Sequence, residues 1–325
     1  MSTRKPILVT GGPRTGTTWV GRVIAKDNSV HYIHEPFNIG NRRCTCGFKV
    51  DHWFHFVCSQ NDSDSITHFT HLLGSPLHRY NLLNLVQDLG SQRNQMANLR
   101  TLKKFAGSLF KPKTLLKDPL AVFSAEWLAS TSNMDVLVMI RHPASFVSSY
   151  KSRNWSHPMS HFLEQPLLMR KYLSPFEEEI RDHEANEHDI AAQVALLWKF
   201  IHFMILIYQN AHPNWIFVRY EDLVLNPMMG FQKIFAQLGL TFSAKIIKMI
   251  EETSNPRNPM DPEMPYSIKQ NSVENLWKWK NRLSSQEIDK IRTVVVGIVG
   301  EFYTEESWVD PQAIAEKVQS TRVSM

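Results

Sequence analysis

A glycine-rich segment near the start of the chain contains residue types that bind phosphate or sulfate groups. Residues 11–18 read Gly-Gly-Pro-Arg-Thr-Gly-Thr-Thr and follow the apolar run at residues 7–9. A strand, a glycine-rich turn and a helix start in this order direct backbone N–H groups and the positive end of a helix dipole at an anion. The spacing matches a phosphate-binding loop, but Thr17 stands where that loop has its lysine. The nearest cation is Arg14, inside the loop.

The missing lysine argues against ATP or GTP, because that lysine and a magnesium ion offset the charge of the β- and γ-phosphates. Asp118 keeps this alternative open, since it follows the apolar run at residues 114–116. An aspartate at the end of such a strand holds magnesium in nucleotide-hydrolysing proteins. An ATP-dependent phosphotransferase, or kinase, is therefore the alternative interpretation of the sequence.

A second anion site is predicted around Arg141. This residue follows the apolar run at residues 136–140, and Ser149 and Arg153 lie four apart on the next predicted helix. Side chains at that spacing share one face of a helix. The arginine can bind a phosphate through two hydrogen bonds and the serine through its hydroxyl.

Together, the two segments resemble those of the sulfotransferases that use 3′-phosphoadenosine 5′-phosphosulfate (PAPS). The resemblance implies that Arg141 and Ser149 hold the 3′-phosphate, and that 3′,5′-adenosine bisphosphate (PAP) is the product. A sulfuryl group carries less charge than a terminal phosphoryl group, so cationic side chains and backbone amides can stabilise its transfer without a metal ion. The loop residues that the resemblance assigns to the donor are Pro13, Arg14, Thr15, Gly16, Thr17 and Thr18.

Sulfuryl transfer also needs a base that takes the proton of the acceptor. Glu35 follows the run at residues 30–34, so it should emerge at the same sheet edge as the glycine-rich loop. In carbohydrate and tyrosylprotein sulfotransferases a glutamate in a similar place is the proposed base, and the sequence resembles them there. His34 is the alternative base, and a glutamate before proline can also simply end a strand.

The segment Lys117-Asp118-Pro119 resembles a Lys-Asp-Pro segment of the same family, in which the lysine contacts the leaving-group oxygen. By that resemblance, Lys117 and Arg14 share the stabilisation of the transition state. Each contributes about 3 kcal/mol, the scale of removing one preorganised donor.

Two later segments, at residues 217–223 and 271–280, also resemble the family. Tyr220 is expected to touch the nucleotide, although a tyrosine at the edge of the core is the competing interpretation. The second segment closes over the nucleotide in the family, which lets Lys278 reach a phosphate. Ser267 is the candidate for the serine that precedes this segment.

These residues can meet only in a fold that brings the ends of several strands together. Short continuous apolar runs separated by helical stretches predict an α/β fold, with a P-loop-type parallel sheet and helices on both faces. The predicted strands are residues 7–10, 30–34, 114–116, 136–140 and 215–218. The predicted helices are residues 17–25, 143–153, 190–210, 228–238, 243–253 and 284–303.

Residues 1–325 are interpreted as a single sulfotransferase domain with insertions at about 38–113 and 154–189. Loops beyond the carboxyl ends of parallel strands are where ligands bind, so the insertions should wall the acceptor cleft. Trp53 and Trp155 could stack on sugar rings, whereas Arg42, Arg43 and Arg79 could bind anionic groups. A hydroxyl-bearing carbohydrate or glycolipid is the expected acceptor, with a protein tyrosine or a small metabolite left open.

Composition limits the partners and the location. The 36 Lys and Arg against 31 Asp and Glu give a net charge of +5, which favours anionic ligands without the basic runs of nucleic-acid binding. An odd count of three cysteines indicates a reducing, cytoplasmic location. Nothing at the N-terminus resembles a signal peptide. The apolar stretch at residues 191–208 contains Lys199 and is expected to be a core helix rather than a transmembrane segment.

A cluster of soft ligands raises the question of zinc. Its members are Cys44, Cys46, His52, His55 and Cys58. The spacing is poor for structural zinc, and residues 50–57 are expected to form a helix that packs aromatic side chains. The sequence therefore predicts a metal-independent sulfotransferase. A non-catalytic nucleotide-binding module would keep Arg14, Arg141 and Ser149 but would show no turnover.

Overall fold

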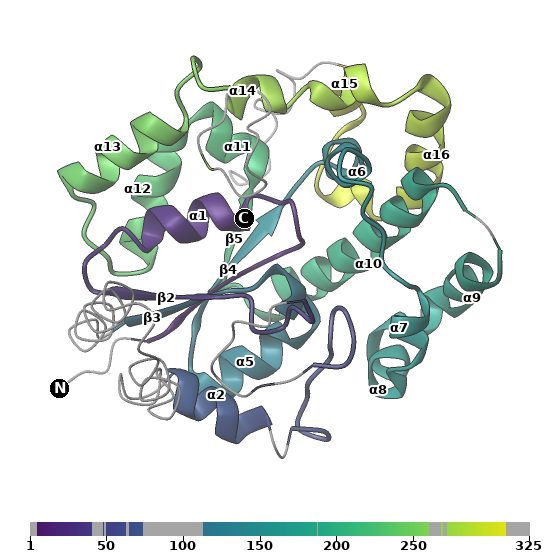
Figure 1. Ribbon diagram of the computed structural model, residues 1–325, viewed down its shortest axis with the longest axis horizontal. Coiled ribbons are helices and arrows are strands. Elements are labelled where there is room, and N and C mark those ends of the chain that lie inside the picture. The colour runs from purple at the N-terminus through teal and green to yellow at the C-terminus, as the bar shows by residue number, and fades with distance from the viewer. Residues whose placement is uncertain are drawn as a thin grey trace, which may run out of the picture.

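The central element is a sheet of five parallel strands in the order β2-β3-β1-β4-β5, which confirms the predicted sheet (Figure 1). The computed structural model describes residues 5–40, 48, 50–62, 65–73, 113–186, 188–259, 268 and 272–309. The strands are β1 Ile7–Thr10, β2 Val30–His34, β3 Lys113–Lys117, β4 Asp135–Ile140 and β5 Ile216–Arg219.

The helices alternate with the strands along the chain. The larger ones are α1 Thr17–Ile24, α2 Ser65–Leu73, α5 Ala125–Ser132, α6 Pro143–Lys151, α9 Glu177–Ala185, α10 Ile190–Ala211, α12 Pro227–Gln237, α13 Ala244–Thr253 and α16 Ser285–Val295. The shorter ones are α7 Ser160–Leu163, α8 Pro166–Leu168, α11 Tyr220–Leu225, α14 Ser272–Asn275 and α15 Lys278–Arg282. A 3-10 helix, Pro119–Ser124, leads into α5, and a π-helix, Met169–Leu173, follows α8.

Successive strand residues feed two separate cores, as the period of two requires. Ile7 and Val9 pack with α1, α11, α12 and α13, whereas Leu8 packs with α5, α6, α10 and α16. Both faces of the sheet are therefore covered by helices (Figure 1). This explains why the strands are continuous apolar runs.

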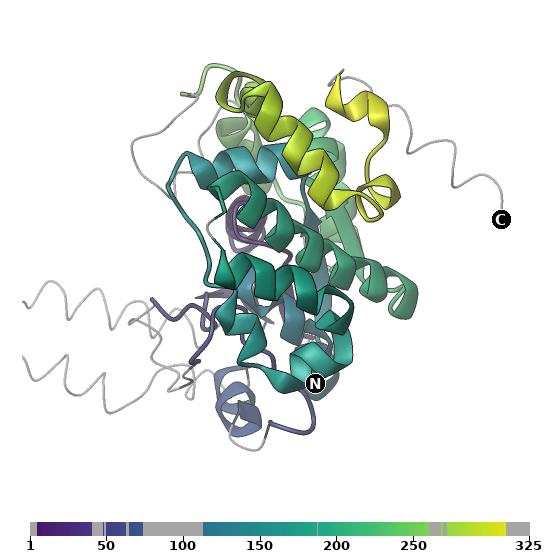
Figure 2. The same cartoon turned by 90° about the vertical axis from the view of Figure 1, so that its right-hand side faces the viewer.

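Helix α10 is long and apolar enough to span a membrane, but 61% of its most apolar window is buried inside the protein. It packs against α6 and α16 on one face of the sheet, and these helices face the viewer in Figure 2. Phe200, Ile201 and Met204 are fully buried in it. The structure thus gives α10 the role of a core helix.

The helix predicted at residues 50–57 is wrong, since this segment consists of bends, turns and irregular backbone. Its backbone N–H groups donate to side chains of other elements, so they need no helical carbonyl. These bonds run from Trp53 to His161 Nδ1 at 2.9 Å, from Phe56 to Gln165 Oε1 at 2.7 Å and from Val57 to Ser124 Oγ at 2.8 Å.

Two predicted helices are shorter than expected. The helix starting at Pro143 ends at Lys151, so Arg153 lies in the following turn. The long helix predicted at residues 284–303 ends at Val295, and Gly297 follows with a φ of 83°. A glycine in the left-handed region is a common way to end a helix. The predicted insertion at 154–189 contains α7, α8 and α9, while most of residues 38–113 lie outside the described residues.

Candidate functional site

The carboxyl edge of the sheet gathers the predicted site residues around a cavity of about 470 Å³. Because every strand runs in the same direction, Glu35 after β2, Arg141 after β4 and Tyr220 after β5 meet at the edge where β1 enters the glycine-rich loop. All three line the cavity. The loop lines it through Pro13, Arg14, Gly16, Thr17 and Thr18. From the two predicted insertions come Asn38, Gly40, Trp53, Trp155, Ser156 and His157.

The glycine-rich loop has a backbone that only certain residues tolerate. Gly16 has a φ of 96°, and a Cβ there would lie 2.6 Å from the Tyr220 ring. Thr15 lies inside the loop, where its hydroxyl donates to the carbonyl of Gly12 at 2.7 Å. Helix α1 starts at Thr17 without a side-chain cap from Gly16, which leaves its first N–H groups to bind an anion.

A second, smaller pocket of about 60 Å³ lies beside the loop and is rich in cations. It is lined by Arg14, Arg141, Arg153, Lys278 and Arg282, and by Ser145, Ser148, Ser149 and Ser152. The sequence predicted five of these residues, and Arg282 and three of the serines were missed.

Buried polar atoms show what this pocket fits. Among the described residues, Arg141 Nε and Ser148 Oγ are buried and have no hydrogen-bonding partner. Burial, with the charges of Arg141 and Arg153, lowers the pKa of Arg14 to about 10. Unpaired donors beside crowded positive charges are satisfied by an anion.

The two cavities adjoin one another. Arg14, Arg141 and Tyr220 line both of them. Arg141 donates through Nη1 to the carbonyl oxygen of Arg14, and its guanidinium lies 4.6 Å from the centre of the Tyr220 ring. Arg14 Nε donates to Ser149 Oγ at 2.9 Å. The two anion sites are therefore neighbours, as the two anionic groups of one ligand require.

The candidate base, Glu35, is held in a strained position beside Lys117. Its φ of 47° is rare for a non-glycine residue and more so before a proline. Lys117, fully buried, donates to Glu35 Oε1, and Asn38 Nδ2 donates to Oε2 at 2.8 Å. Burial raises the pKa of Glu35, but the charge and hydrogen bond of Lys117, together with His34 and Asn38, outweigh it, so the pKa lies below its ordinary value.

Comparison with known proteins assigns the chain to a family. Residues 6–244 match the model of the sulfotransferase family. The chain belongs to the sulfotransferase family. One stretch of 96 residues is 27% identical to carbohydrate sulfotransferase 1 of Danio rerio, and it covers 28% of this chain but only 23% of that relative.

Solved sulfotransferase structures resemble the chain over most of its length. The sulfotransferase STF9 of Mycobacterium avium is 12% identical with a TM-score of 0.42, and the match covers 94% of this chain and 78% of that one. The sulfotransferase domain of the curacin biosynthetic pathway is 15% identical with a TM-score of 0.45, and the match covers 89% and 96% of the two chains.

Asp118, which kept the kinase alternative open, has a different role in this sulfotransferase. It is fully buried, and its carboxylate accepts backbone N–H groups of Phe37 at 2.6 Å and of Leu120 at 3.0 Å. Burial raises its pKa to about 7. An aspartate that ties two loops together in this way does not present its oxygens to a magnesium ion, so the structure does not favour a kinase.

The remaining candidates, and two residues that the sequence did not predict, complete the description of the site. His34 does not line the cavity; its Nε2 lies 3.9 Å from Glu35 Oε2 and its side chain is 42% exposed. Ser267 lies outside the described residues, as do Cys44 and Cys46. Asn38 and His157 line the cavity, but the sequence carried no motif that would have identified them.

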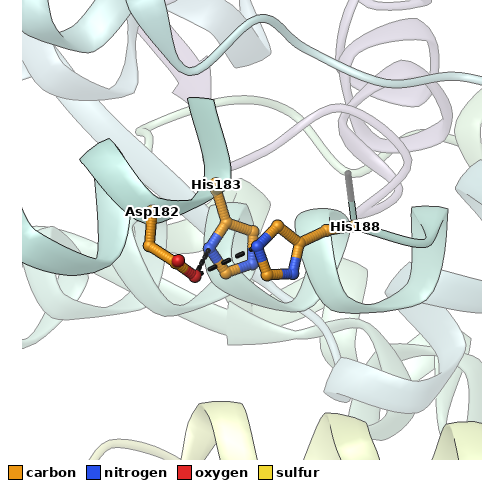
Figure 3. A group of neighbouring side chains, drawn as sticks. All are labelled: Asp182, His183 and His188. Carbon is orange, nitrogen blue, oxygen red and sulfur yellow. Dashed lines mark ion pairs between the residues drawn. The ribbon is translucent and has the colours of Figure 1, made fainter. Parts of the chain in front are cut away.

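Among the described residues, Asp182, His183 and His188 form a group whose potential ligand atoms lie within 4.8 Å of one another (Figure 3). Asp182 Oδ2 lies 3.0 Å from His188 Nε2 and 4.0 Å from His183 Nδ1, and the two imidazole rings stack at 3.9 Å and 10° (Figure 3). Lone pairs of parallel rings lie in parallel planes and do not converge on one ion. The group therefore forms two ion pairs and a stack, and it lines neither cavity.

Proposed function

We propose that this sulfotransferase moves a sulfuryl group from PAPS to a hydroxyl group of an acceptor. One observation carries the proposal: the cationic pocket and the loop cavity share Arg14, Arg141 and Tyr220. PAPS carries anionic groups at both ends of one adenosine, so it matches two adjoining anion sites. ATP would leave the cationic pocket without a partner for the buried Arg141 Nε and Ser148 Oγ.

The proposal divides the donor between the two cavities. Arg141, Ser149, Arg153 and Lys278 would hold the 3′-phosphate in the cationic pocket. The N–H groups of the loop and of the start of α1 would hold the 5′-phosphosulfate. When bound, PAPS supplies an activated sulfuryl group with PAP as its leaving group.

The chemistry then follows from the residues beside the loop. Glu35 takes the proton of the acceptor hydroxyl, so that the oxygen can form its bond to sulfur as the bond from sulfur to the bridging oxygen of PAP breaks. Negative charge develops on that bridging oxygen, and Lys117 and Arg14 supply the positive charge that stabilises it. Asn38 holds the other oxygen of Glu35 and thereby fixes the direction in which the base points.

We further propose a carbohydrate as the acceptor. Trp53 and Trp155 line the cavity and come from the two predicted insertions. Aromatic faces stack on the apolar faces of sugar rings, and a tryptophan offers a large rigid surface. The partial likeness to carbohydrate sulfotransferase 1 of Danio rerio supports the same class.

The donor is tested by binding and by transfer. PAP in the absence of magnesium should raise the melting temperature, whereas ATP with magnesium should not. At a PAP concentration of a hundred times Kd, binding adds about 2.7 kcal/mol to the free energy of unfolding. Arg141→Ala should abolish the shift, and Arg181→Ala, which removes an exposed arginine from α9, should not change it. Stabilisation by ATP with magnesium alone would favour the kinase.

Catalysis is tested separately from binding. Glu35→Gln keeps the shape of the side chain but cannot accept the proton, so transfer from labelled PAPS should fall by roughly a hundredfold or more. The affinity for PAP should stay near normal. A variant that turns over at the normal rate would show that Glu35 is not the base, and a wild type that binds PAP without any transfer would indicate a non-catalytic binding module.

A further inference from the structure

His157 is a buried histidine in the wall of the loop cavity, in the segment between α6 and α7. Its residue is only 8% exposed. Its ring packs against Trp53 and Phe54, with centroids at 5.2 and 5.1 Å, and it lies edge-on to both. Among the described residues, its Nδ1 is buried without a hydrogen-bonding partner. A buried polar atom without a hydrogen-bonding partner lowers the stability of the fold, so a bound ligand that supplies the partner is favoured.

The other ring nitrogen already has a neighbour. His157 Nε2 lies 3.4 Å from the hydroxyl of Tyr150. Burial raises the pKa of Tyr150 well above its ordinary value, so its hydroxyl keeps its proton. Burial, with the charge of His161, lowers the pKa of His157 to about 4. The imidazole is therefore neutral near pH 7, and its Nδ1 suits an uncharged polar partner such as a hydroxyl.

We propose that His157 is a specificity-determining residue of the acceptor site, whose Nδ1 hydrogen-bonds a second hydroxyl of the acceptor, distinct from the one that Glu35 deprotonates. This inference rests on the proposed function. It requires an acceptor with at least two hydroxyl groups, as a sugar ring has, lying between Glu35 and the wall formed by Trp53, Trp155 and His157. An acceptor with a single hydroxyl gains nothing from His157.

The test compares acceptors that differ by one hydroxyl. A panel of p-nitrophenyl galactoside, glucoside and mannoside identifies the glycoside that the wild type sulfates best, and its monodeoxy analogues follow. One analogue lacks the hydroxyl that is sulfated and is set aside. With the wild type, one of the other deoxy analogues should have a kcat/KM about tenfold below that of the parent glycoside, mainly through a higher KM. For His157→Phe, the parent glycoside should already show that loss, and the same deoxy analogue should lose nothing more.

Three controls separate this role from a structural one. With 2-naphthol, which has one hydroxyl, His157→Phe should match the wild type within about twofold. His157→Asn, whose amide lies near the position of Nδ1, should recover part of the selectivity, whereas His157→Gln should not. The melting temperature and the affinity for PAP should be retained in the variants used. If His157→Phe fails to fold, His157→Gln, which should also lack the selectivity, takes its place in the comparison.

The inference is overturned if the fall in kcat/KM from the parent glycoside to each deoxy analogue is the same in the wild type and in His157→Phe. It is also overturned if the wild type binds PAP and sulfates 2-naphthol but no glycoside of the panel. A protein that does not bind PAP at all would instead contradict the proposed function, so the two failures are distinguishable.

Discussion

Glu35 and Lys117 form a buried pair in which each residue sets the protonation of the other. Burial raises the pKa of Glu35, and Lys117, together with His34 and Asn38, lowers it by more. Replacing Lys117 with methionine removes the largest of these lowering influences and leaves burial, so the pKa of Glu35 should rise. The base is active only when deprotonated, and that form is lost as the pH falls through its pKa. The acid limb of kcat/KM should therefore move to higher pH in Lys117→Met, on top of a large loss in rate.

A pH series of transfer rates from labelled PAPS measures this shift. Lys113→Met is the matched control, because Lys113 is also buried on β3 but lies at its other end, where it pairs with Asp135 at 3.3 Å. Its acid limb should coincide with that of the wild type. An acid limb that stays in place in Lys117→Met would show that Glu35 does not control it.

At the residue scale, the sequence identified the groups whose roles depend on a motif. Arg14, Glu35 and Arg141 follow strands, so their meeting at one edge could be predicted from strand direction alone. Asn38 and His157 could not be found in this way. They reach the cavity because the segments after β2 and after α6 fold back over the sheet edge, and no local spacing records that path.

The glycine-rich loop and α11 are elements that must fit each other. A Cβ at Gly16 would lie 2.6 Å from the Tyr220 ring, and the φ of 96° disfavours any side chain. We expect Gly16→Ala to lose about 1–3 kcal/mol of stability through backbone strain. It should also weaken PAP binding by roughly tenfold to a hundredfold, because a displaced loop misplaces its donors.

Gly239 provides the control for backbone strain alone. Its φ of 62° is also positive, but a Cβ there would meet nothing within 4 Å. Gly239→Ala should therefore lose about 1 kcal/mol of stability and leave PAP binding unchanged. Chemical denaturation and calorimetric titration measure the two effects. Equal PAP affinity in Gly16→Ala and the wild type would contradict the assignment of this loop to the donor.

Elements were predicted well where the apolar pattern reflects burial on both sides. Strand β1 has the predicted bounds and is fully buried, because a continuous apolar run is what a covered parallel sheet requires. Strand β2 also has the predicted bounds, although it is a partly buried edge strand. The segment at residues 50–57 was mispredicted because its aromatic side chains are buried without a helix. The side chains of His161, Gln165 and Ser124 accept hydrogen bonds from three of its N–H groups, and the positions of these side chains depend on the tertiary fold.

The donor site is a property of the whole molecule, since its charges come from distant parts of the chain. Arg14 follows β1, Arg141 follows β4 and Lys278 opens α15. These side chains line one pocket, where burial, together with the charges of Arg141 and Arg153, lowers the pKa of Arg14. A highly charged ligand should relieve the repulsion among these positive charges, and its binding should depend strongly on salt.

We therefore expect the Kd for PAP to rise by at least about tenfold between 0.1 and 1 M NaCl, as the screening length falls from about 10 to about 3 Å. Lys278→Ala should weaken binding at low salt and flatten this dependence, because it removes one of the interacting charges. Adenosine, which shares the nucleoside but lacks both anionic groups, should bind weakly and with little dependence on salt. Calorimetric titration at several salt concentrations measures all three. A PAP affinity as insensitive to salt as that of adenosine would mean that the clustered arginines do not hold the phosphates, and the donor would then have to be recognised through its nucleoside alone.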